Sequence, residues 1–171
     1  MHHTPKVVLV LVFWGESEYP LKKGVIEMSD NHTYTTKLEW TQNRKGALSS
    51  SGLPTMEVAT PPSFPGGHEG IWSPEHLFVG AAEVCLMTTF LAIAEKSRFE
   101  FLAYTSSASG TLGTLDRGMF VEKIVIKPRL VISDESQRDK ALLLLEKAKK
   151  HCLISKSMIS EVTMEAQVVL G

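Results

Sequence analysis

The segment Ser73–Phe90 reads SPEHLFVGAAEVCLMTTF and predicts a long helix at the centre of the fold. Ser73 suits the N-cap, Pro74 the first helical position, and Glu75 the positively polarised first turn. From there to about Ser97, apolar residues occupy nearly every side of the expected helix. A helix that is apolar all round is buried, so other elements must surround it.

The segments on both sides of this helix predict an α+β fold. Alternation of β-forming residues indicates strands, and an acid-first, base-last pattern indicates a second helix. The predicted elements are strands at 34–40, 47–50, 99–108, 119–132 and 161–170, and helices at 134–150 and 151–159; residues 56–59 are a further short apolar segment. Residues 110–118 are expected to form a loop. This order is typical of mainly antiparallel sheets wrapped around a long buried central helix.

The length of 171 residues favours one domain. Clear periodicity begins at Met28, so residues 28–171 are predicted to form that domain. We expect residues 1–27 to be a peripheral N-terminal extension, which an over-long translation start would explain. The apolar run Val7–Trp14 within them is too short to span a bilayer, and no small-x-small cleavage site follows it.

The composition argues against two classes of partner. The chain is 43% apolar and 22% charged, with a formal net charge of -1. Binding to nucleic acid or to a membrane surface favours a basic excess, so neither is expected. The two cysteines, Cys85 and Cys152, are too few for a disulfide framework and suit a reducing compartment. We therefore expect a cytoplasmic protein.

One long loop precedes the central helix. Thr60–Gly70 reads TPPSFPGGHEG, and its three prolines and three glycines exclude a regular element. Long loops in compact domains are often functional.

The cysteines leave several interpretations open. Cys85 in an apolar helix is most simply a small core residue. A metal site is not expected, because neither CxxC nor HExxH occurs and zinc needs four closely spaced ligands. A cysteine hydrolase would need a base, for which His68 in the loop is the candidate.

A thiol peroxidase needs a thiolate, a cation beside it, and a second thiol that resolves the sulfenic acid. The sequence around Cys85 contains no cation, and burial alone would raise its pKa and make it inert. An activating arginine would have to come from elsewhere. Arg44, in the turn TQNRKG, is the candidate; its simpler role is an exposed turn charge.

Glu75 and Cys85 cannot touch within one straight helix. Ten residues separate them by about 15 Å along the axis and place them on different faces. A shared site therefore requires either a helix broken near Gly80 or a two-fold dimer that combines two chains. Gly80, Ala81 and Ala82 are small enough for another backbone or a substrate to approach closely.

The motifs WSPEHLFVGAAEVC and HCLIS, with the earlier NRKG, resemble the OsmC/Ohr family of osmotically inducible and organic hydroperoxide resistance proteins. The resemblance extends from about Tyr34 to Leu170. It implies an intertwined homodimer with two sites at the subunit interface. It further implies that Cys85 is the peroxidatic cysteine and Cys152 the resolving one. By the same resemblance Arg44 activates the thiolate and Glu75 orients that arginine.

The implied function is a thiol-dependent peroxidase that reduces organic hydroperoxides to alcohols. The oxidised protein is then reduced by a lipoyl group or a small dithiol, and no cofactor is expected. The alternative is a non-catalytic OsmC-like stress or ligand-binding module with an inert Cys85. Two features depart from typical Ohr members: CLIS replaces a CPYS-like stretch, and Glu83 lies close to the nucleophile. They leave the subgroup, the natural peroxide and the reductant open.

Overall fold

The computed structural model describes residues 32–116 and 118–171. The prediction made for residues 1–27 lies outside these residues. The chain divides into two units, residues 1–34 and 35–171, and every helix and strand described below belongs to the second unit.

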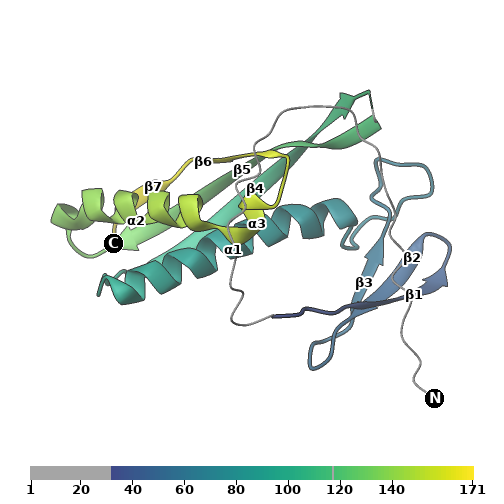
Figure 1. Cartoon of the computed structure of the whole chain (residues 1–171), viewed down its shortest axis with the longest axis horizontal. Helices are drawn as coiled ribbons and strands as arrows, with labels where there is room; N and C mark the ends of the chain where they lie inside the picture. Colours follow the sequence, from purple (N-terminus) through teal and green to yellow (C-terminus); the bar gives the residue numbers. More distant parts are fainter. Residues whose placement is uncertain (1–31, 117) are drawn as a thin grey trace, which may run out of the picture. The chain divides into compact units, whose positions relative to one another are not determined.

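The first sheet has three antiparallel strands in the order β1 (Lys37–Gln42), β2 (Lys45–Ser49) and β3 (Met56–Ala59) (Figure 1). Asn43 opens the tight turn between β1 and β2 at φ 48°, a conformation that asparagine tolerates better than most residues. The indole nitrogen of Trp40 donates to the Asn43 carbonyl at 2.9 Å. All residues of β1 are exposed within the subunit.

The central helix α1 runs from Pro74 to Lys96. Its start is the predicted cap: the Ser73 hydroxyl accepts from the backbone N–H of His76 at 3.3 Å, and the His76 ring accepts from the Ser73 N–H. The helix is unbroken at Gly80, which excludes the kinked alternative. By length and composition alone α1 could span a membrane, a property that it shares with core helices of soluble proteins.

The burial of α1 differs from the prediction. Only one stripe, spaced four residues apart, is fully buried within the subunit: Ala82, Leu86, Phe90 and Ala94. Phe78, Val84 and Leu91 on other faces remain exposed. The described part of the chain therefore buries only one side of a helix that is apolar nearly all round.

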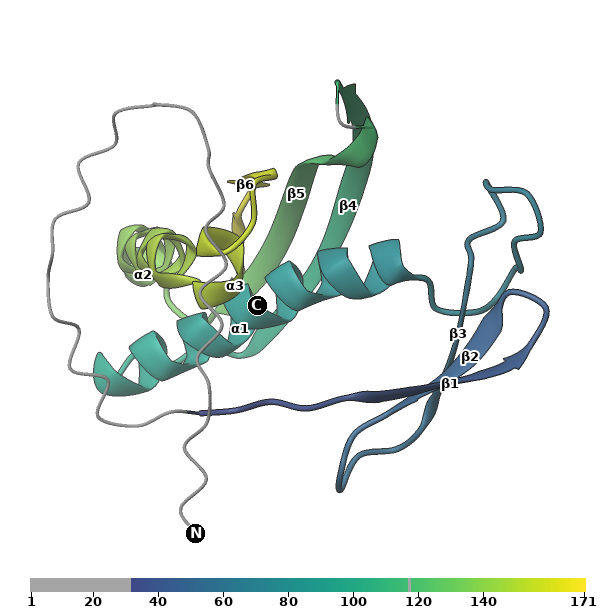
Figure 2. The same cartoon turned by 45° about the vertical axis from the view of Figure 1, so that its right-hand side comes forward.

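The second sheet has β5 at its centre. The strand β4 (Ala103–Leu115) pairs antiparallel with β5 (Gly118–Ile132), and together they form a long hairpin (Figures 1 and 2). The predicted loop at 110–118 is therefore mostly strand. Gly110 lets β4 approach α1 closely, because a Cβ there would lie 2.5 Å from the Val79 side chain.

The end of the chain corrects the sequence prediction in two ways. The predicted strand 161–170 is two short strands, β6 (Glu161–Met164) and β7 (Gln167–Leu170). Both pair with β5 in parallel. The parallel orientation follows from the helical connection after β5. A helix that crosses back over the sheet makes the next strand run in the same direction as β5.

That connection contains a 3-10 turn η1 (Glu135–Gln137), the helix α2 (Arg138–His151) and the short helix α3 (Leu153–Lys156). The helix α2 lies beside α1 (Figure 2). Residues from both helices and from β5 form the core, whose largest fully buried members include Phe90, Leu86, Leu145, Ile124 and Leu130.

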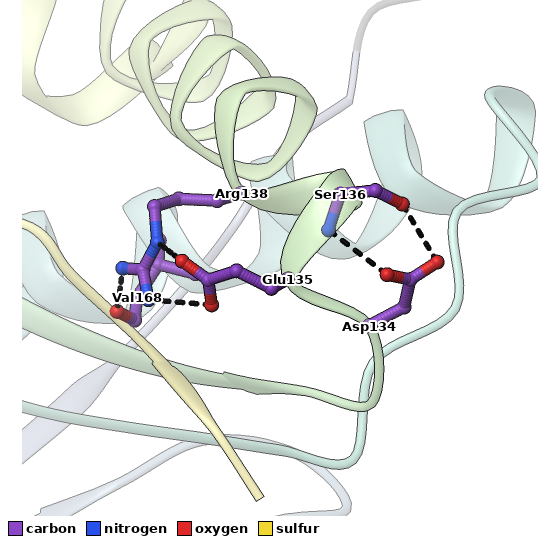
Figure 3. A network of polar contacts seen from close by, with 5 residues as sticks. All are labelled: Asp134, Glu135, Ser136, Arg138 and Val168. Atoms are coloured by element: carbon purple, nitrogen blue, oxygen red, sulfur yellow. Dashed lines mark hydrogen bonds and ion pairs between the residues drawn. The ribbon is translucent and has the colours of Figure 1, made fainter.

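A polar network anchors the start of α2 (Figure 3). Asp134 caps η1 by accepting from the N–H of Ser136 at 2.9 Å and from its hydroxyl at 2.7 Å. The Arg138 guanidinium donates to both carboxylate oxygens of Glu135 and to the carbonyl of Val168 in β7. These contacts tie α2 to the sheet at the end opposite Cys152.

Candidate active site

Cys85 lies in the middle of α1 and is half-buried. Its sulfur accepts a hydrogen bond from the backbone N–H of Ile154 at 3.5 Å and lies 4.0 Å from the hydroxyl of Thr89. The start of α3 therefore packs onto the central helix at this cysteine.

Cys152 occupies the junction between α2 and α3 and is 1% exposed. Its sulfur accepts from the N–H of Ser155 at 3.4 Å and from the Ser155 hydroxyl at 3.0 Å. It also lies 4.0 Å from the carbonyl of Ala82 on α1. Of the small residues predicted to allow a close approach, Ala82 thus contacts the Cys152 side chain, whereas the space beside Gly80 is open.

The structure brings the two cysteines together although 67 positions separate them in the sequence. Burial alone would raise the pKa of Cys85. Hydrogen bonds from the Cys152 thiol, the Ile154 and Leu153 amides and the Thr89 hydroxyl outweigh that effect, so the pKa of Cys85 is lowered. Within this chain, these donors therefore make Cys85 ionise more readily than an ordinary cysteine.

Cys152 shows the opposite behaviour. Burial raises its pKa, and the hydrogen bond that it makes to Cys85 raises it further, whereas the two donors of Ser155 act against this. One sulfur is therefore biased toward the thiolate and its neighbour toward the protonated thiol. This asymmetry suits one nucleophile and one resolving thiol.

Sequence reasoning missed the contribution of α3 to this site. It required a distant arginine for any reactivity of Cys85, whereas the amides at the start of α3 already stabilise the thiolate. The signal was present in the sequence as Cys152 followed three residues later by Ser155, the spacing of a helix cap.

Arg44 lies in the turn between β1 and β2 and is exposed. Within the described residues its guanidinium has no ion-pair partner. The loop predicted to be functional packs against it: Gly66, at φ +73°, is so close that a Cβ there would lie 3.0 Å from the Arg44 Nε. A side chain at position 66 would therefore displace the arginine as well as strain the backbone.

Glu75 lies in the first turn of α1, as predicted, and one of its carboxylate oxygens is buried. Among the described residues this oxygen has no hydrogen-bond partner. A buried carboxylate oxygen without a partner is costly. Because α1 is continuous, Glu75 stays about 15 Å along the axis from Cys85.

Two other candidates lie apart from the cysteine pair. His68 lines a hollow with Trp72 and His76 that does not include Cys85, so the base predicted for a hydrolase lies elsewhere than at the thiol. Glu83 accepts a hydrogen bond from the Ser106 hydroxyl on β4 and thus turns toward the second sheet.

The comparison with known proteins agrees with this architecture. Residues 66–167 match the family model described as OsmC-like protein. The chain belongs to the OsmC-like family. The α+β fold with its long central helix, as predicted from the sequence, is confirmed.

Several relatives of this OsmC-like protein are known. The uncharacterised protein YmaD of Bacillus subtilis is 34% identical over 152 residues, covering 84% of this chain and 99% of YmaD. A structure of an OsmC-like protein of unknown function from Vibrio cholerae superposes with a TM-score of 0.73 and 26% identity, covering 80% and 99% of the two chains. An organic hydroperoxide resistance protein from Elizabethkingia anophelis, 19% identical, shares the fold with a TM-score of 0.65 over 84% and 100% of the chains.

The Ser155 contacts lead to a testable prediction. Ser155→Ala removes the hydroxyl that donates to Cys152, so the pKa of Cys152 should rise further, because that hydrogen bond stabilises the thiolate. The measurement is the thiolate absorbance at 240 nm against pH in a Cys85→Ser background. Ser157→Ala is the matched control, because that hydroxyl donates to the Leu153 carbonyl instead. Superimposable titrations of all three proteins would show that Ser155 does not tune the thiol.

Proposed function

We propose that this OsmC-like protein is a thiol-dependent peroxidase that reduces organic hydroperoxides to alcohols, with Cys85 as the peroxidatic and Cys152 as the resolving cysteine. The observation that carries the proposal is the contact between the two thiols, which have opposite shifts in pKa. An inert core cysteine would need neither a neighbouring thiol nor the donors that stabilise its thiolate.

The reaction follows from this pair. The Cys85 thiolate attacks the distal oxygen of the peroxide and breaks the O–O bond, so that the alcohol leaves and sulfur becomes a sulfenic acid. The Cys152 thiol then attacks that sulfur, a disulfide forms, and the hydroxyl departs as water. A dithiol returns both cysteines to the reduced state by exchange.

A homodimer would complete the site. The partner subunit's Arg44 and the partner subunit's Glu75 would then lie beside Cys85. Three properties of the single subunit support this arrangement: the unpaired oxygen of Glu75, the unpaired guanidinium of Arg44, and the open space around Gly80. Pairing two chains would also cover the exposed Leu38 and Trp40 on β1.

The surroundings of Arg44 support an organic peroxide as substrate. Arg44 borders an open hollow of about 590 Å³ whose walls are mainly apolar: Leu38, Trp40, Leu48, Val58 and Leu77. A cation beside apolar walls can polarise a peroxide group and at the same time accommodate an alkyl or aryl chain. Hydrogen peroxide would gain nothing from these walls. We place the reaction in the cytoplasm, where dithiol reductants keep thiols reduced.

Intact mass spectrometry tests the proposal. One equivalent of cumene hydroperoxide should remove two hydrogens from the reduced protein, because the Cys85–Cys152 disulfide forms. Peptide mapping should find the two cysteines linked. A mass that stays unchanged while the peroxide remains unconsumed would instead identify a non-catalytic module.

A further inference from the structure

The cap of α1 contains a histidine where the usual capping box has glutamate or glutamine. In that box the side chain three residues after the N-cap accepts a hydrogen bond from the N-cap backbone N–H. Here His76 Nδ1 accepts from the Ser73 N–H at 3.3 Å, and the Ser73 hydroxyl accepts from the His76 N–H at 3.3 Å. The cap therefore depends on a type of side chain whose charge changes near neutral pH.

These contacts determine the state of the imidazole. A backbone N–H can only donate, so Nδ1 carries a lone pair and the neutral ring has its proton on Nε2. The Ser73 hydroxyl, 2.8 Å from Nδ1, can donate to the same lone pair. The indole of Trp72 packs edge-on against the ring, at 6.0 Å between centroids, and restricts its rotation.

Protonation of Nδ1 removes this acceptor. A protonated Nδ1 can still donate to the Ser73 hydroxyl, but the Ser73 N–H then has no partner. Ser73 is fully buried, so water does not replace the lost bond. The imidazolium also lies at the positively polarised end of α1, where a cation is unfavourable.

Several charged groups surround the ring. Glu75 and Glu83 line one hollow with His76, and their carboxylates attract an imidazolium. Glu69 and His68 line another hollow with it, where the carboxylate attracts an imidazolium and a charged His68 repels it. Within residues 32–116 and 118–171 none of these groups accepts from the N-cap N–H, so none restores the cap once the ring is charged.

The first turn of α1 is held through Ser73. Besides the two bonds of the capping box, the Ser73 carbonyl accepts from the Leu77 N–H at 3.0 Å. Pro74 has no N–H that could add a further bond. The same turn carries Glu75, whose buried carboxylate oxygen has no partner among the described residues. The direction of that carboxylate therefore depends on the cap.

We propose that His76 is a positioning residue: in its neutral form it fixes the first turn of α1 and so directs Glu75, and in acid it releases both. The inference rests on the proposed function, in which Glu75 orients the arginine that activates Cys85. It adds a loss of activity in mild acid that the titration of Cys85 does not cause.

Nuclear magnetic resonance tests the cap without any assay of activity. At about pH 8 the ring correlations of the ¹⁵N-labelled full chain should show the Nε2–H tautomer of His76. As the pH falls to about 5.5, the Ser73 amide resonance should move together with the ring, and protection of the Leu77 amide from hydrogen exchange should fall about tenfold. An Nδ1–H tautomer at the higher pH, or a Ser73 amide that ignores titration of the ring, would overturn the proposal.

His76→Gln is the matched variant, since glutamine accepts from the Ser73 N–H at every pH. Both proteins should consume cumene hydroperoxide at similar rates near pH 8, whereas at about pH 5.5 the wild type should be about tenfold slower than the variant. Titration of Cys85 affects both alike and cancels in this ratio. His76→Ala has no acceptor and should be slow throughout, and His68→Gln should keep the pH dependence of the wild type.

The two measurements separate this inference from the proposed peroxidase. A protein with the stated tautomer and the loss of protection in acid, yet without consumption of cumene hydroperoxide, would retain His76 as the residue that holds the first turn and lose the peroxidase. A peroxidase whose pH profile is the same in the wild type and in His76→Gln would keep its activity and lose the role of His76.

Discussion

Replacing Cys85 by serine is expected to abolish consumption of cumene hydroperoxide in the presence of excess dihydrolipoamide. The rate should fall by at least about 10³-fold, because a serine hydroxyl is not ionised at neutral pH and is a far weaker nucleophile than a thiolate. The measurement is peroxide loss against time at equal protein concentration. Folding is checked by circular dichroism, since Cys85 is only half-buried and serine has a similar size.

Cys152→Ser is the matched control for this change. It retains the nucleophile, so one equivalent of peroxide should still be consumed rapidly and leave a sulfenic acid at Cys85 that dimedone can trap. Steady turnover should then fall, because the resolving thiol is missing. Rapid multiple turnover by the Cys85→Ser protein would refute the assigned nucleophile.

Arg44→Ala is expected to slow peroxide attack by about 10²–10³-fold, the magnitude found when a group that stabilises developing charge is removed. It should also raise the pKa of Cys85, which is measured by the pH dependence of iodoacetamide alkylation. The pKa of Cys85 should still stay below that of an ordinary cysteine, since the α3 amides and the Cys152 thiol lower it from within the same chain. Lys45→Ala, at the next position, is the control.

Mixed dimers can show which chain supplies the arginine. Neither Cys85→Ser nor Arg44→Ala homodimers should be active. Random mixing of the two chains makes half of the dimers mixed, and each mixed dimer has one site with both Cys85 and the partner subunit's Arg44, so about a quarter of wild-type activity should return. If Arg44 acted on Cys85 of its own chain, no site in any mixed dimer would be complete and no activity would return.

Much of the fold could be predicted from local signals. The Ser73 cap, the apolar run that follows it, and the alternation in β5 all act over a few residues, so the sequence displays them directly. The parallel pairing of β6 and β7 could not be predicted in this way, because it depends on how the crossover through α2 returns the chain. The exposed faces of α1 were misjudged for a related reason: hydrophobicity indicates that a helix favours burial but not how many of its faces this chain buries.

Some features of the candidate site could likewise be predicted from local sequence, and others could not. The Glu75–Cys85 separation could be calculated from helix geometry, and the continuous α1 confirms it. The contact of Cys85 with Cys152 and Ile154 depends on packing between segments far apart in sequence, which only the fold determines. The assignment of Arg44 rests on the motif, and the mixed-dimer experiment would test it.

The position of Cys152 bears on how well the protein would resist irreversible oxidation by excess peroxide. The Arg138 network holds one end of α2 against the sheet, and the other end delivers the second thiol directly beside the first. In the proposed reaction the disulfide would therefore form between two thiols that are already neighbours. In the proposed reaction a sulfenic acid formed there would have a short lifetime, so a second peroxide molecule would have little time to convert it irreversibly to the sulfinic acid.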